Sequence, residues 1–194
     1  VQTKGTAKEK FALLKALGFQ GVEIDRPSGL DLAELLAARD ATGVLIHGVV
    51  DSVHWRDRLS DPNEETRAKG LAALRSALAD AKTVGADTVL LVPGKVTPDA
   101  TFEQCWERSS AEVRKAIPDA DRLGVKIAIE VVWNDFLTKP EQLVEYVDQF
   151  KTPAVGAYFD ASNMLKYGVP AAEWVRKLGP RMLKLDFKGG RRPR

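Results

Sequence analysis

The chain has 194 residues, of which 44% are hydrophobic and 29% charged, and its formal net charge is +2. These values are typical of a soluble globular protein with one sizeable core, and the charge does not decide for or against a nucleic-acid partner. No apolar stretch approaches the roughly 20 residues of a membrane span, so a membrane-spanning helix is not expected. The single cysteine, Cys105, excludes an internal disulfide and favours a reducing compartment, so we expect a cytoplasmic protein.

Helical and strand patterns alternate along the whole chain. Apolar residues at helical spacing, mostly ending at a glycine, predict helices over residues 7–18, 31–43, 64–85, 101–123, 139–150 and 170–179. Short apolar runs between them predict strands over residues 21–24, 44–50, 87–94, 125–130, 154–160 and 181–188. No linker rich in Pro, Gly or Ser interrupts the series. The pattern therefore predicts a single domain over residues 1–194, built of βα units around a parallel sheet.

Two parallel architectures fit such an alternation. A doubly wound sheet that binds a dinucleotide usually has a glycine-rich first turn, and no G-x-G-x-x-G motif occurs in the sequence. In a (β/α)₈ TIM barrel, the active groups lie where strands end and loops begin. Carboxylates fall in or at the end of four predicted strands, at Glu23, Glu130, Asp160 and Asp186. We therefore expect an α/β fold of the TIM-barrel type.

Three of these carboxylates follow one another at the spacing of one βα unit. Glu130 ends a short apolar strand in the stretch KIAIEVVWNDF, Asp160 ends AYFD, and Asp186 lies in LKLDFK. Three clustered negative charges repel one another at low dielectric, and a divalent cation with oxygen ligands is the usual remedy. The alternative for Asp160 is a turn or helix-capping residue, and the alternative for Asp186 is an ion pair with Lys184 or Lys188.

Several segments together resemble the sugar phosphate isomerase/epimerase family of xylose isomerase-like TIM barrels, which includes hydroxypyruvate isomerases, ketose 3-epimerases and inosose dehydratases. The segments that carry the resemblance are KFALLKALGFQGVEID, IHGVVDSVHW, KIAIEVVWNDFL, YFDASNMLKYG and RMLKLDFK. The resemblance covers nearly the whole chain, and the order of these segments is more specific than any one of them.

The resemblance implies roles for individual residues. Glu130 matches a metal ligand that is also one of two acid/base carboxylates, and Asp160 matches a second metal ligand. Asp186 stands where many members have a histidine, and aspartate is also able to bind a metal ion. His47 matches a histidine at the mouth of the pocket. The residues expected to bind substrate are His47, Trp133, Asn134, Asn163 and Lys188.

The six predicted strands map onto the second to the seventh strand of the family barrel. On this mapping, the family's first strand would precede Val1, and its eighth strand, with the second catalytic glutamate, would follow Arg194. We therefore expect an incomplete barrel in which the strands of Glu23 and Asp186 are open edges, with pairing to another copy of the chain as an alternative.

These observations favour a metal-dependent isomerase or epimerase of a sugar or sugar phosphate, which moves a proton beside a carbonyl through an enediolate. Mn²⁺ or Mg²⁺ is the expected metal, with Co²⁺ and Zn²⁺ as alternatives, and no nucleic-acid or membrane partner is expected. One alternative is a non-catalytic or truncated barrel. Another is a DNA-repair enzyme of the AP endonuclease type, but such enzymes use a histidine-rich zinc site, and this chain has only His47 and His54.

Overall fold

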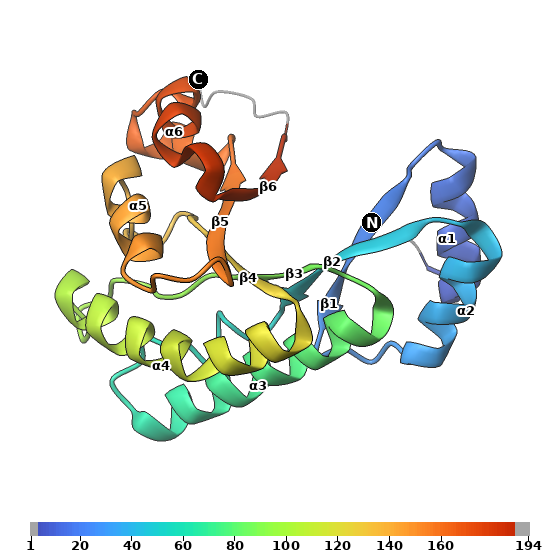
Figure 1. The fold of residues 1–194 in the computed structure, drawn as a ribbon, viewed down its shortest axis with the longest axis horizontal. Helices are drawn as coiled ribbons and strands as arrows, with labels where there is room; N and C mark the ends of the chain where they lie inside the picture. The colour runs from blue at the N-terminus through green and yellow to red at the C-terminus, as the bar shows by residue number, and fades with distance from the viewer. Residues whose placement is uncertain (1–3, 189–194) are drawn as a thin grey trace.

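The protein folds as one curved sheet of six parallel strands with helices on its outer side (Figure 1). The structure is a computed structural model that describes residues 4–188, so the predicted domain bounds 1 and 194 lie outside the described residues. The strands are hydrogen-bonded in chain order, β1-β2-β3-β4-β5-β6, and each neighbouring pair is parallel. They are β1 Gly21–Arg26, β2 Leu45–Asp51, β3 Thr88–Leu91, β4 Lys126–Glu130, β5 Val155–Asp160 and β6 Met182–Asp186.

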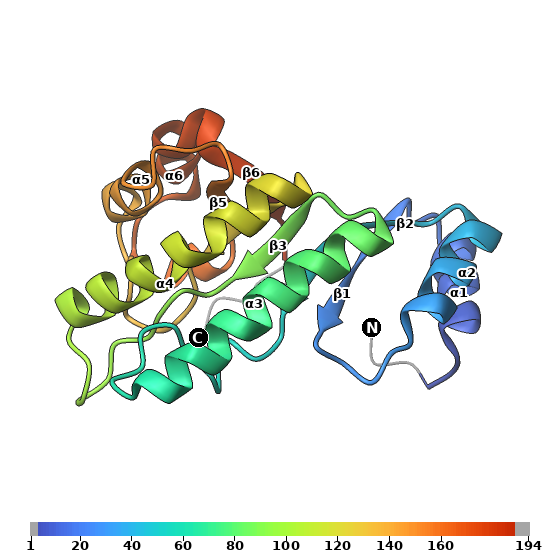
Figure 2. The same cartoon turned by 60° about the horizontal axis from the view of Figure 1, so that its bottom comes forward.

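The helices alternate with the strands, as the sequence predicts. In Figure 1, α1 and α2 lie beside β1 and β2, α3 and α4 run below the central strands, and α5 and α6 lie beside β5. Figure 2 shows α3 and α4 side by side, in agreement with their contacts. The helices are α1 Ala7–Ala16, α2 Leu32–Thr42, α3 Glu64–Val84, α4 Phe102–Leu123, α5 Pro140–Asp148 and α6 Ala171–Leu178, and the short 3₁₀ helices are η1 Asn163–Tyr167 and η2 Gly179–Arg181.

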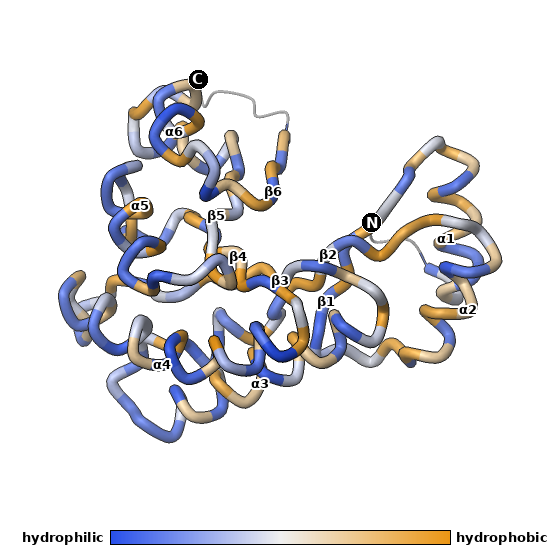
Figure 3. The backbone as a smooth tube through the Cα atoms, in the orientation of Figure 1, coloured by the Kyte–Doolittle hydropathy of each residue, from blue (hydrophilic) through white to orange (hydrophobic). Residues whose placement is uncertain are grey.

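The ends of the helices follow from local sequence. Thr6 and Thr101 each begin a helix with a capping box, in which the threonine side chain and a Glu or Gln three residues later satisfy each other's backbone N–H groups. Gly85 and Gly124 end α3 and α4 with positive φ values of 82° and 66°, a conformation that costs glycine little. In Figure 3 the helices change repeatedly between hydrophilic and hydrophobic colours, as amphipathic helices do.

The main core lies between the sheet and the helices. Every residue of β3 and β5 is buried, whereas β1 and β6 have partly exposed residues because, within residues 4–188, each pairs with a strand on one side only. These two strands are the predicted open edges. No helix in the described part of the chain has the length and apolarity needed to cross a lipid bilayer.

Trp174 of α6 is a large contributor to this core. Its side chain is fully buried and its ring stacks on Phe159 of β5 at 6.4 Å between ring centroids. Its indole Nε1 is buried without a hydrogen-bond partner among the described residues. We expect Trp174→Ala to lower the free energy of unfolding by about 3–5 kcal/mol. Trp174→Phe should cost much less, because it keeps a ring against Phe159 and removes an unpaired N–H group; urea denaturation of both variants measures the difference.

Candidate functional site

Three carboxylates mark the carboxyl-terminal edge of the sheet. Glu130, Asp160 and Asp186 are the last residues of β4, β5 and β6, which are neighbours in the sheet. Asp160 and Asp186 are paired in the register of β5 and β6. The carboxyl ends of parallel strands form one edge, so the three side chains share the end of the barrel at which TIM-barrel enzymes act.

Lys188 joins two of these carboxylates. Its Nζ lies 2.7 Å from Asp160 Oδ2 and 2.8 Å from Asp186 Oδ2. Asp160 Oδ1 accepts hydrogen bonds from the backbone N–H of Ser162 at 2.8 Å and from its hydroxyl at 2.6 Å. Burial of Asp160 by itself raises its pKa, but the hydrogen bonds from Lys188 and Ser162 outweigh burial and hold the pKa below its ordinary value. Asp160 is therefore a buried, ionised carboxylate.

Glu130 differs from Asp160 in its electrostatics. Its side chain is buried, and burial raises its pKa to about 7, with smaller increases from the charges of Asp160, Asp186 and Glu23 and a decrease from Lys188. A carboxyl group with a pKa near neutral pH is suited to take up and release a proton. Glu130 is therefore the group at this edge best matched to acid/base chemistry.

Asn163 connects Glu130 to Asp160. Its Nδ2 donates to Glu130 Oε1 at 3.2 Å, and its backbone N–H donates to Asp160 Oδ1 at 3.2 Å. Trp133 Nε1 donates to the carbonyl oxygen of Asn163 at 3.0 Å, although 64% of the surface of Trp133 is exposed. Because Asn163 begins η1, this short helix fixes the two carboxyl groups relative to each other. The sequence pattern does not predict η1, although the Ser162-Asn163 pair after Asp160 is a turn signal.

Two further predicted substrate-binding residues, Asn134 and His47, make contacts within the chain. Asn134 is only 3% exposed, and its side chain donates to Gly94 O at 2.6 Å and accepts from the backbone N–H of Phe136, so its hydrogen-bonding groups are used to shape the loop. His47 is the third residue of β2 and lies at the register shift between β1 and β2, where Val22 pairs with Ile46 and Glu23 pairs with Gly48. Its Nδ1 lies 3.8 Å from Glu23 Oε1.

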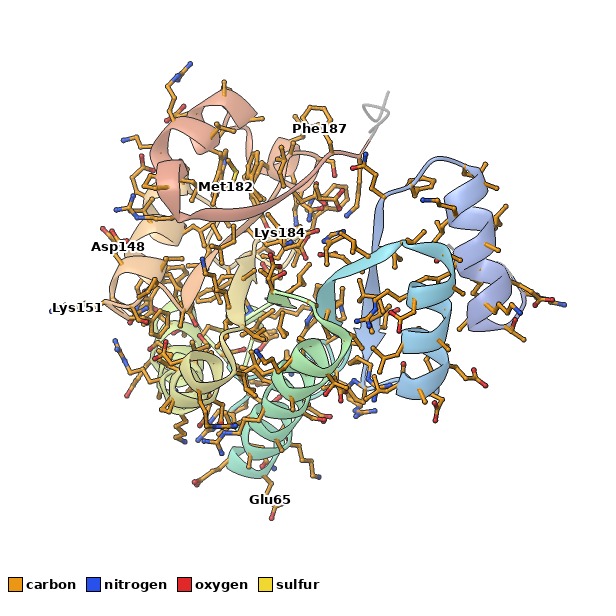
Figure 4. The ribbon with its side chains drawn as sticks, turned by 45° about the vertical axis from the view of Figure 1, so that its right-hand side comes forward. Glu65, Asp148, Lys151, Met182, Lys184 and Phe187 are labelled. Carbon is orange, nitrogen blue, oxygen red and sulfur yellow. The ribbon has the colours of Figure 1, made fainter. Side chains whose placement is uncertain are left out.

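The inner face of the sheet carries two polar contacts that the sequence analysis does not predict. Tyr158 Oη donates to Glu23 Oε2 at 3.0 Å, which links β5 to β1. Burial, together with Glu23, raises the pKa of Tyr158, so the phenol stays protonated and acts as the donor. Lys184 of β6, labelled in Figure 4, donates to the carbonyl oxygen of His47 at 3.1 Å and lies 2.9 Å from Asp87 Oδ1. No sequence signal pairs residues that lie this far apart along the chain.

Asp51 and His54 form a second buried pair of titratable groups, where β2 ends. Burial raises the pKa of Asp51 to about 7. The hydrogen bond from the backbone N–H of Val53 lowers this pKa in part, and the charge of Asp57 raises it further. Burial lowers the pKa of His54 to about 4, and its Nδ1 accepts the backbone N–H of Val92 at 3.4 Å. His54 therefore has a structural role as a neutral ring.

These two groups should give opposite pH dependences of stability. Between about pH 4 and 7 the folded state keeps a proton on Asp51 that the unfolded chain loses, so Asp51 lowers stability as the pH rises. Between about pH 4 and 6.5 the unfolded chain binds a proton that folded His54 excludes, so His54 lowers stability as the pH falls. Asp51→Asn keeps an oxygen that accepts the backbone N–H of Val53, and it removes the decrease in stability with rising pH that Asp51 causes.

We expect the melting temperature of Asp51→Asn to rise more steeply than that of the wild type between pH 4.5 and 6.5. At pH 8 it should exceed the wild type by several degrees, since 1 kcal/mol corresponds to about 2–4 °C in a chain of this size. Thermal melts from pH 4.5 to 8 measure this, with the exposed Asp99→Asn as control. Parallel curves for Asp51→Asn and the wild type would show that Asp51 titrates normally in the folded state.

The comparisons with known proteins agree with this architecture. Residues 11–192 match the family model described as xylose isomerase-like TIM barrel. The chain belongs to this family. Its sequence is 27% identical over 167 residues to L-ribulose-5-phosphate 3-epimerase UlaE of Escherichia coli O1:K1 / APEC, an alignment that covers 80% of this chain and 59% of the relative. The chain thus spans about three fifths of the length of the curated relatives it matches.

Two solved structures show the same fold. The apo form of 3-keto-D-glucoside 4-epimerase YcjR from E. coli superposes with a TM-score of 0.83 at 17% identity, over 97% of this chain and 76% of that chain. D-psicose 3-epimerase from Clostridium cellulolyticum H10, solved with D-tagatose, gives a TM-score of 0.80 at 21% identity, over 95% of this chain and 68% of that chain. The predicted TIM-barrel fold is therefore confirmed, with six neighbouring parallel strands in the described residues.

The sequence also predicts a divalent cation at this edge. Within residues 4–188, no three side chains of His, Cys, Asp or Glu are already arranged as a metal-binding cluster. The donor atoms nevertheless fit the chemistry of Mn²⁺ or Mg²⁺, because Glu130, Asp160 and Asp186 offer only carboxylate oxygens. The geometry also accommodates positive charge here, since the Lys188 ammonium lies between two of the three.

Proposed function

We propose that this protein is a metal-dependent isomerase or epimerase that acts on a ketose or ketose phosphate. The observation that carries the proposal is Glu130, a buried carboxyl group with a pKa of about 7 beside two further carboxylates, Asp160 and Asp186, at the same end of the sheet. The family membership and the epimerases among the similar proteins support this reading. The single cysteine is a free, buried thiol, which supports the cytosol as the compartment.

In this mechanism Glu130 removes the proton from the carbon beside the substrate carbonyl on one face of the substrate. Return of this proton to the neighbouring carbon gives an isomer, whereas inversion of the same carbon needs a second acid on the opposite face. Asp160, Asp186 and Glu130 would hold a divalent cation, which supplies polarisation of the substrate carbonyl when bound. Asn163 keeps Glu130 in place through its amide, and Lys188, which pairs with Asp160 and Asp186 in the metal-free protein, donates to a substrate oxygen. Trp133 braces Asn163 from the exposed side.

The proposal is tested by proton exchange with solvent. The purified protein is incubated in D₂O with Mn²⁺ or Mg²⁺ and a panel of ketoses and ketose phosphates, and NMR follows deuterium at the carbon beside the carbonyl and the appearance of an epimer or aldose. Metal-dependent exchange with at least one sugar supports the proposal. Absence of exchange across the panel, in a protein that is folded and binds Mn²⁺, would favour the non-catalytic barrel instead.

A further inference from the structure

Glu23 has one carboxylate oxygen that no group in the described structure satisfies. Its Oε2 accepts the hydroxyl of Tyr158 at 3.0 Å, but its Oε1 is buried and has no hydrogen-bond partner in residues 4–188. The nearest cationic candidate, His47 Nδ1, lies 3.8 Å away, which is too long for a hydrogen bond. Buried carboxylate oxygens are nearly always bonded, so this one needs a donor from outside the chain's own side chains.

The position of Glu23 places this oxygen across from the candidate acid/base residue. Tyr158 is the register partner of Glu130 on the neighbouring strand, and its hydroxyl reaches Glu23 on β1. The charge of Glu23 is also one of those that act on Glu130. Gly48 of β2 faces the Glu23 carboxylate so closely that a Cβ atom would collide with it. The absence of a side chain at Gly48 therefore gives the carboxylate its space on the inner face.

The charges around this space disfavour an anion. Lys184 is already paired with Asp87 at 2.9 Å, and Lys188 is paired with both Asp160 and Asp186. Among the described residues of this inner face, the carboxylates of Glu23 and Glu130 have no ammonium within ion-pair distance. A phosphate group, with a charge of about −1.5 to −2, would meet two carboxylates there. A neutral hydroxyl group would instead supply the proton that Glu23 Oε1 needs.

We propose that Glu23 Oε1 accepts a hydroxyl group of the sugar and that the substrate is an unphosphorylated ketose. This inference rests on the proposed function and narrows it. A hydroxyl donated to an ionised carboxylate makes a charge-assisted hydrogen bond, which is stronger than a neutral one. Glu23 is then a specificity residue: it favours the free sugar by the bond it makes and rejects the phosphate by its charge.

The test compares matched pairs of sugars: D-fructose, D-tagatose and D-ribulose, each with its terminal phosphate ester. Turnover is measured with Mn²⁺, and binding is measured by calorimetry in the Glu130→Gln background, where turnover does not interfere. The wild type should prefer each free ketose over its phosphate by at least about tenfold in kcat/KM. Glu23→Gln should lose about 10- to 100-fold in kcat/KM for the free ketose, mainly through KM, and lose nothing for the phosphate.

Two further variants separate the explanations. Glu145→Gln removes the same charge from the exposed surface of α5 and should behave as the wild type. Glu23→Asp keeps the negative charge, but its side chain is one methylene shorter, so the carboxylate oxygen no longer reaches the same position. This variant should also lose affinity for the free ketose while it still rejects the phosphate. Thermal melts confirm that each variant is folded.

The outcomes distinguish this inference from the proposed function. Preference for the phosphate by the wild type, or unchanged affinity for free ketoses in Glu23→Gln, overturns the inference and leaves the isomerase proposal in place. If no sugar is turned over, the isomerase proposal fails, and calorimetry still decides the role of Glu23. Binding of a free ketose that depends on Glu23 supports the inference, and absence of such binding overturns it.

Discussion

Replacing Glu130 by Gln should reduce the rate of solvent exchange on a ketose substrate by about 10²–10⁴-fold, the usual contribution of a general acid/base. Glutamine has the same shape and can still accept the amide of Asn163, which donates to Glu130 Oε1 at 3.2 Å. It cannot take up a proton from carbon. The loss should therefore appear in kcat, with KM nearly unchanged, because the variant removes an interaction made in the chemical step.

Stability provides an internal check on this variant. Glutamine resembles the protonated form of Glu130, which burial already favours up to about pH 7. Glu130→Gln should thus melt at or above the wild-type temperature, most clearly at pH 8, where the wild type carries a buried charge.

The matched control is Glu112→Gln. Glu112 is also a buried glutamate, but it lies on α4 and pairs with Lys115 and Arg67 on the outer layer. This variant should keep full exchange activity per folded molecule. Equal exchange in Glu130→Gln and the wild type would assign the base to another residue and end the acid/base role of Glu130.

The fold could be predicted from the sequence because helices and strands are marked by local residue patterns. Parallel strands that are buried on both faces appear as short apolar runs, and capping glycines such as Gly85 and Gly124 separate them from the helices. The positions of Glu130, Asp160 and Asp186 at strand ends were predictable for the same reason, since a charged residue after an apolar run can be recognised from the sequence alone. Strand order follows, because consecutive βα units lie next to one another.

The inner face of the sheet was not predictable, because it depends on register. Shifts between β1 and β2 and between β5 and β6 change which residues face inward, and no residue pattern marks either shift. Lys184 and Asp186 face the barrel because of the second shift, and His47 lies at the first. The contact between Tyr158 and Glu23 joins residues 135 positions apart, so it exists only once the sheet has curved.

Asn134 illustrates a second limit. In sequence it is an amide beside an exposed tryptophan after a catalytic-type glutamate, which suggests substrate binding. In the structure its two hydrogen bonds, to Gly94 O and from Phe136 N–H, shape the loop that follows β4. Whether a polar side chain serves a ligand or the backbone depends on which buried backbone groups lack partners, and that is a property of the folded loop.

Replacing Lys188 by Met should increase the response of the protein to a divalent cation. The variant leaves Asp160, which is completely buried, and Asp186 without the ammonium that lies 2.7 and 2.8 Å from them. At low ionic strength, repulsion among these carboxylates and Glu130 should lower the melting temperature of the metal-free protein by several degrees. Added Mn²⁺ should then raise it by more than in the wild type, since it supplies the missing positive charge and no longer competes with Lys188.

Lys115→Met separates this effect from the loss of any lysine. Lys115 pairs with buried Glu112 at 2.9 Å, and its side chain is 54% exposed against 58% for Lys188, so the two lysines are similarly exposed. Both variants should lose some stability, but only Lys188→Met should recover it with Mn²⁺, with tighter Mn²⁺ binding by calorimetry. An equal Mn²⁺ response in both variants would mean that the cation acts on the surface in general. Weaker Mn²⁺ binding by Lys188→Met would instead show that Lys188 is needed to assemble the three carboxylates, so that the metal joins the ammonium at this edge rather than replacing it.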